Sequence, residues 1–191
     1  MDVQKDGLHC PSTVVGALID LASSAFAHSG TPMEVEIENL EHLVEMLHLL
    51  RPDNVDFSFF DGWLRMLHKE WSEAEDIFRG LVERSVCMPA SRGMLLQCLK
   101  ARGDFGWKDE ARTIVEEGGD KDVTRLAKLL LASDDLKDAA AAGRRTGRFV
   151  TPESARAVEE EEGDEAADNG AGATSSQLTS DMLLAMHYMR I

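Results

Sequence analysis

Apolar residues recur every three or four positions through most of the first 130 residues of this chain. The clearest case lies between positions 33 and 47, where one side of a helix would carry Met33, Ile37, Leu40, Val44 and Leu47. No segment alternates apolar and polar residues as a half-buried strand does. The periodicity therefore predicts an all-α fold whose short connections make neighbouring helices antiparallel.

Start and stop signals divide this pattern into separate helices. Thr31 and Glu34 form a capping box with Pro32 at the first helical position, and Ser72 and Glu75 form a second box. The expected helices span residues 12–28, 31–50, 56–68, 72–82, 89–102, 108–117 and 121–132. Residues 135–148 are compatible with a helix but weakly apolar.

The charge balance excludes several classes of partner. The chain carries 35 acidic and 20 basic residues, a formal net charge of -15. Nucleic acids and anionic membranes both attract basic surfaces, so neither is an expected partner. No apolar run is long enough to cross a membrane. The three cysteines form no spaced cluster, and we expect them to be reduced thiols.

The charge distribution sets the expected limits of the folded domain. Residues 151–191 hold nine acidic and two basic residues, including the run from Glu159 to Glu165. The next large apolar side chain is Leu178, so this stretch cannot bury enough surface to offset its ordering entropy. We expect a flexible N-terminus at 1–11, a tetratricopeptide-like helical domain at 12–133, a weak helical fringe at 134–150, a disordered acidic linker at 151–177 and a short amphipathic segment at 178–191.

A 34-residue period links two successive helical hairpins. Gly62 and Ala74 are small residues where the two helices of a tetratricopeptide repeat cross, and Phe78 completes the expected Ala-x3-Phe spacing. The turn at 103–105 repeats the turn at 69–71, although the second copy departs from the pattern after that point. The structural repeat positions are Gly62, Trp63, Trp71, Ala74, Phe78 and Gly103.

Four segments carry a resemblance to a known family. They read LRP at 50–52, FDGWL at 60–64, WSEA at 71–74 and LLQCLKARGDFGW at 95–107. In these segments the chain resembles the HrpB/HrpK family of bacterial type III secretion proteins. It is similar, more distantly, to the tetratricopeptide chaperones that hold needle subunits in that apparatus. The resemblance covers roughly residues 33–132 and brings no catalytic residue set with it.

The resemblance implies a non-enzymatic part in type III secretion. We expect a chaperone or adaptor that needs no cofactor and binds an amphipathic helix of a secreted, needle or pilus subunit. The first helix of each hairpin lines the groove of such arrays. The candidate groove residues are therefore Arg65, Met66, Gln97 and Lys100.

The alternative interpretation is a self-associating structural scaffold of the apparatus. The chain opens without the layout of a secretory signal, which favours the cytoplasm. The periplasm is the alternative location, because export through the apparatus itself needs no such signal.

The polar side of residues 31–50 has residue types that can bind a metal ion. It carries Glu38, Glu41, His42, Glu45 and His48, and Glu45-x-x-His48 has the spacing used by di-metal bundles. Such a site needs a second pair on a facing helix, which the sequence lacks, so we interpret this side as solvated and expect no metal. We interpret His68 as a helix C-terminal histidine favoured by the helix dipole, and Cys98 as a small buried hydrophobe.

The amphipathic segment at 178–191 leaves two alternatives open. Ser180 would cap a short helix whose apolar positions include Leu178, Met182, Leu183, Met186 and Met189. Flexible methionines suit an adaptable docking surface, so the segment would dock into the groove of its own or a neighbouring chain. Alternatively, it simply packs on the core or stays disordered.

Overall fold

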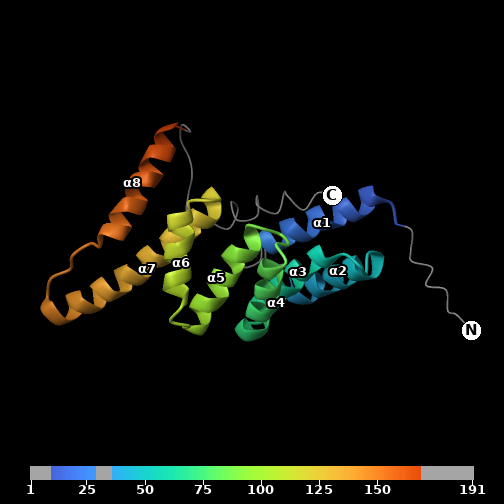
Figure 1. Cartoon of the computed structure of the whole chain (residues 1–191), viewed down its shortest axis with the longest axis horizontal. Helices are drawn as coiled ribbons and strands as arrows, with labels where there is room; N and C mark the ends of the chain where they lie inside the picture. Colours follow the sequence, from blue (N-terminus) through green and yellow to red (C-terminus); the bar gives the residue numbers. More distant parts are fainter. Residues whose placement is uncertain (1–9, 29–35, 169–191) are drawn as a thin grey trace, which may run out of the picture. The chain divides into compact units, whose positions relative to one another are not determined.

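The computed structural model describes residues 10–28 and 36–168 and confirms the all-α fold (Figure 1). Its helices are α1 (Ser12–His28), α2 (Ile37–Leu50), a short 3-10 helix η1 (Val55–Phe57), α3 (Ser58–Leu67), α4 (Trp71–Glu83), α5 (Ala90–Arg102), α6 (Trp107–Glu117), α7 (Lys121–Thr146) and α8 (Glu153–Asp168). The described residues form no strand. They divide into two compact units, one up to Cys98 and one from Leu99, so the boundary falls within α5.

An aromatic cluster forms the core of the first unit. Phe26 from α1 stacks on Phe60 and Trp63 of α3 at ring-centroid distances of 5.5 and 4.9 Å. Phe59 meets the edge of Phe78 from α4 at 5.5 Å. These four phenylalanines are at most 1% exposed, and aromatic side chains contribute large buried areas to a core. The cluster therefore ties α1, α3 and α4 together.

The α3–α4 hairpin contains the close helix crossing that the repeat predicts. A Cβ atom added at Gly62 would lie 2.7 Å from Cζ of Phe78, so only glycine fits there without a shift. Ala74 is fully buried on the facing helix. The structure thus accounts for three of the repeat positions by steric need, while the tetratricopeptide-like arrangement of the whole array stays a prediction.

The second capping box that the sequence suggests is wrong. Helix α4 begins at Trp71 with Glu70 at the N-cap, and no side chain caps it. Glu75 is only 6% exposed and accepts a hydrogen bond from Arg79 one turn further on, at 2.6 Å. The carboxylate is engaged with Arg79 instead of the helix start. The first box, Thr31 with Glu34, lies outside the described residues.

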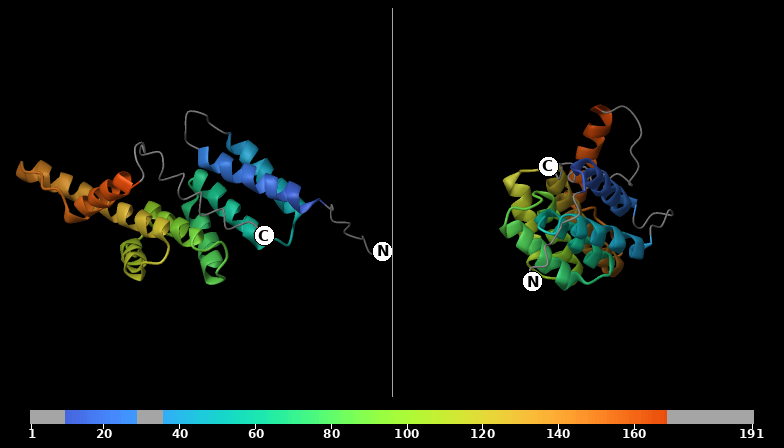
Figure 2. Two further views of the ribbon diagram at one scale, coloured as in Figure 1. Left: turned by 90° about the horizontal axis from the view of Figure 1, so that it is seen from above. Right: turned by 90° about the vertical axis from the view of Figure 1, so that its right-hand side faces the viewer.

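The second unit contains α6, α7 and α8, and capping residues mark the ends of the first two. Asp120 caps α7 by accepting hydrogen bonds from the backbone N–H groups of Asp122 and Val123. Gly118 and Gly147 end α6 and α7 in the left-handed conformation that glycine adopts readily. The two longest of these helices, α7 and α8, form a hairpin (Figure 2).

Residues 134–168 differ from the sequence-based expectation. The expected domain boundary after residue 133 lies inside α7, which continues to Thr146. Most of the expected weak fringe at 134–150 is therefore part of α7. The part of the expected disordered linker that the structure describes is mostly helix α8. Ala155 of α8 is buried, Ser154 donates to Asp135 at 2.7 Å, and Glu161 pairs with Lys128. The charge composition alone suggested that the entropy cost of ordering this segment would keep it unfolded. The packing of α8 against α7 offsets that cost.

Candidate functional site

A cavity of about 380 Å³ opens beside α1, bounded by that helix and the segment from Arg51 to Phe60. Its apolar lining comes from Val15, Ile19, Phe57 and Phe60. Val15, Phe57 and Phe60 are at most 6% exposed and fixed by the core. Because core packing fixes these three side chains, the cavity is a preformed recess suited to an apolar group.

Small residues on α1 keep the recess open. Ser12, Thr13 and Gly16 line it together with the apolar residues. A Cβ atom at Gly16 would meet no other atom within 4 Å, so the space beside this glycine is empty of protein. A side chain added at position 16 would therefore start in open space on the lining of the recess.

The rim of the cavity carries charges of both signs. Arg51 donates to the backbone oxygens of Cys10 at 2.8 Å and Leu50 at 3.1 Å, which fixes the start of α1 against the end of α2. The carboxylates of Asp20 and Asp56 lie elsewhere on the lining. The recess thus combines apolar lining residues with one cationic and two anionic residues, a pattern typical of ligand-binding pockets.

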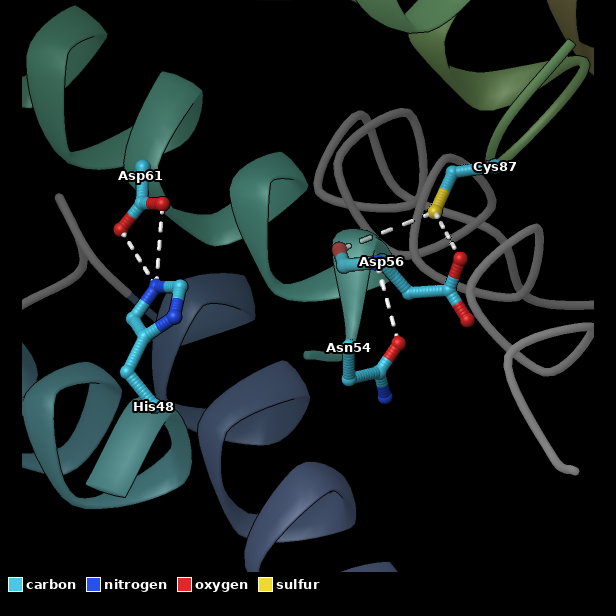
Figure 3. Close-up of polar contacts among 5 residues, drawn as sticks. All are labelled: His48, Asn54, Asp56, Asp61 and Cys87. Atoms are coloured by element: carbon cyan, nitrogen blue, oxygen red, sulfur yellow. Dashed lines mark hydrogen bonds and ion pairs between the residues drawn. The ribbon is translucent and has the colours of Figure 1, made fainter. Parts of the chain in front are cut away.

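Asp56 also meets a cysteine thiol (Figure 3). Asn54 accepts a hydrogen bond from the backbone N–H of Asp56, while Cys87 lies 3.8 Å from its carbonyl oxygen and 3.9 Å from Oδ1. Burial raises the pKa of the Cys87 thiol to about 12, and the negative charge of Asp56 adds to the effect. Cys87 therefore stays a thiol at neutral pH and lacks the reactivity of a catalytic thiolate.

Two histidine–carboxylate pairs join α2 to α3 in a reciprocal pattern. His48 of α2 lies 3.0 Å from both carboxylate oxygens of Asp61 on α3 (Figure 3). Glu41 of α2 lies 2.7 Å from Nε2 of His68 at the end of α3. Each helix contributes an acid and, seven residues later, a histidine, so antiparallel packing brings both pairs together.

These pairs correct two interpretations from the sequence. Glu41 and His48 contact the neighbouring helix, so their side of α2 is only partly a solvated face. His68 occupies the C-cap position of α3, as expected, but it also binds a carboxylate on another helix. Glu45 and His48 do not join a larger ligand set, and the described residues contain no group of three or more side chains suited to a metal ion.

Of the four residues expected to line a groove, three lie in the first unit and Lys100 lies in the second. Arg65 pairs with Glu70 at 2.6 Å and Glu73 at 3.2 Å, and these carboxylates raise the pKa of its guanidinium. Met66 is buried, with 9% of its surface exposed, which contradicts the expectation that it is one of the least core-like positions. Gln97 is half-buried in the first unit, and Lys100 belongs to the second.

Lys100 has a structural role within the second unit. Its Nζ donates to the backbone oxygen of Leu130 at 2.8 Å and lies 4.8 Å from the ring centroid of Trp107. Burial lowers the pKa of Lys100, and the charge of neighbouring Lys137 lowers it further. The side chain thereby connects α5 to α6 and α7, which leaves little of it for a partner.

The remaining repeat positions have structural explanations. Trp63 stacks on Phe26, and Trp71 is half-buried at the start of α4. Gly103 has a positive φ of 73° in the turn after α5, a conformation that favours glycine. Cys98 is fully buried, and burial raises the pKa of its thiol to about 12, as expected for a small hydrophobic residue.

Sequence analysis missed the cavity, because its lining comes from two segments about 40 positions apart. Only the small residues at 12, 13 and 16 in an otherwise apolar helix hint at open space. None of the described helices is both long and apolar enough to cross a bilayer.

The fold and the recess define a class of all-α proteins built from packed helical hairpins. Within this class, the model of the bacterial type III secretion protein family (HrpB1_HrpK) matches residues 5–136. The match covers more than half of the chain, so the chain belongs to that family. No curated protein and no solved structure matches this chain.

Proposed function

We propose that this chain is a non-enzymatic chaperone or adaptor of type III secretion that binds an amphipathic helix of a secreted, needle or pilus subunit. Membership of the secretion family supports the setting. The observation that carries the binding role is the preformed recess beside α1, with Phe57 and Phe60 at its base. An amphipathic helix commonly binds by placing apolar anchors into such a recess.

The rim charges specify the chemistry of the partner helix. Asp20 and Asp56 favour a lysine or arginine close to the apolar anchor, and Arg51 favours a carboxylate further along. Burying the anchor would remove from water the surface through which a secreted subunit polymerises. The protein would thus hold the subunit in a monomeric form before export.

We place the first contact at this recess instead of at the four groove residues. Arg65 and Lys100 are engaged within their own units, and Met66 is part of the core. The recess, in contrast, presents apolar atoms that no described side chain covers. In this proposal the protein acts in the cytoplasm, where subunits await export.

The test is copurification of the tagged full-length chain from cells that express the whole secretion gene cluster. Gly16→Trp fills the recess, and Ala17→Trp adds the same side chain at the adjacent exposed position outside the lining. We expect a small helical subunit to elute with the original chain and with Ala17→Trp, and to be lost with Gly16→Trp. Circular dichroism of each variant verifies that the fold is unchanged.

Equal recovery of the subunit with both variants would contradict the recess as the binding site. The scaffold alternative has its own support, because several large apolar side chains of the first unit are exposed: Val14, Leu21, Met46 and Leu49. Elution of the chain with further copies of itself and no secretion subunit would favour that periplasmic scaffold.

A further inference from the structure

We propose that residues 178–191 of this same chain occupy the recess beside α1 until a partner displaces them. The inference rests on the proposed function, since it assigns a competing ligand to the same recess. Its support is that the apolar and charged residues of the segment complement the residues that line the recess. The segment lies outside the described residues.

The apolar positions of the segment match an irregular apolar recess. Leu178, Met182, Met186 and Met189 follow one another at steps of four, four and three residues, which places them on one side of a helix. Methionine is unbranched and flexible, so its side chain adapts to the space between Val15, Ile19 and the two phenylalanines.

The charges of the segment stand on either side of this apolar stripe. Asp181 and Arg190 are nine residues apart. At about 100° of turn per residue they lie on opposite flanks of the stripe, and at a rise of ~1.5 Å per residue they are separated by about 13 Å along the helix. The segment contains no other aspartate, glutamate, lysine or arginine.

The rim of the recess carries the opposite charges at a similar spacing. Arg51 is bonded to the carbonyl of Cys10 at the start of α1, and Asp20 lies eight residues beyond Ser12, the first residue of that helix. The same helical rise separates the start of α1 from Asp20 by about 12 Å. A segment running parallel to α1 would therefore place Asp181 near Arg51 and Arg190 near Asp20.

Photo-crosslinking of the full-length chain tests this placement. A p-benzoylphenylalanine replaces Thr13, which lines the recess, or Ala17, which is exposed on the same helix outside the lining. After irradiation, denaturing electrophoresis separates monomeric from linked chains, and mass spectrometry maps the linked peptide. We expect a crosslink within one chain from position 13 to residues 178–191, at several times the yield found from position 17.

A charge exchange makes the test specific for the proposed register. Asp20→Lys and Arg190→Glu should each lower the crosslink yield roughly three- to fivefold, as expected for a partly exposed ion pair, and the double variant should restore it. Independent effects of the two substitutions, without restoration, would contradict the pairing of these residues.

Other crosslinks would overturn the inference. Linked dimers, crosslinks to residues 1–9, or equal yields from positions 13 and 17 would show that the recess does not hold this segment. Crosslinking in cells that express the secretion gene cluster separates the two proposals. Capture of a secreted subunit at position 13 without any tail crosslink would preserve the proposed function and reject the internal ligand.

Discussion

At the scale of single residues, the close packing of a glycine against an aromatic ring decides how α3 and α4 meet. Gly62 has no room for a Cβ atom, because Phe78 is fully buried and held against Phe59. The sequence identified both residues through their spacing within the repeat. The steric reason for that spacing required the structure.

Gly62→Ala should therefore destabilise the first unit by about 1–2 kcal/mol, since overpacking outweighs the gain in helix propensity. Gly80→Ala is the matched control on α4, where the nearest atom to the added Cβ lies 3.9 Å away at the end of Arg84. That variant should be neutral or stabilised by up to ~1 kcal/mol. Urea unfolding measures both, and equal shifts of the two midpoints would contradict the close crossing.

At the scale of elements, the α2–α3 contact shows how two helices recognise one another through a repeated polar pattern. Glu41 and His48 on one helix meet His68 and Asp61 on the other, and His48 also packs edge-on against Phe57. Local sequence could not reveal this, because each polar stripe alone has the pattern of a solvated face. The pairing depends on the antiparallel placement of both helices.

A double-mutant cycle measures the contribution of one pair. His48→Gln and Asp61→Asn should show a coupling of about 0.3–1 kcal/mol, because both side chains are more than a third exposed. Arg112 and Asp109, an exposed pair within α6, provide the comparison and should couple more weakly. Coupling no greater than in that pair would show that the α2–α3 contact depends on apolar packing alone.

At the scale of the whole molecule, helical structure extends past the limit that the charge distribution predicts. Helix α8 belongs to the folded second unit, since Ala155 is buried and Lys128 and Asp135 bind its side chains. A linker assignment based on charge alone therefore begins too early in the chain. The contacts between α7 and α8 place α8 in the folded part of the second unit.

Two truncations of the chain test this limit. Removal of residues 169–191 should leave the stability of the second unit unchanged within ~0.5 kcal/mol, because α8 is retained. Removal of residues 151–191 should lower the stability of the second unit by about 1–3 kcal/mol, because the buried face of α8 is lost from α7. If the second unit has the same stability in both truncated chains, α8 does not contribute to that stability.

The sequence by itself determined the all-α class, most helix positions and the family, because helical periodicity and the Gly62–Phe78 spacing are local properties of the chain. Only the tertiary structure decided the burial of Met66, the histidine–carboxylate pairs, the folding of α8 and the recess beside α1. Each of these depends on side chains from separate helices meeting in space. Periodicity states which side of a helix is apolar, whereas the three-dimensional packing determines what that side contacts.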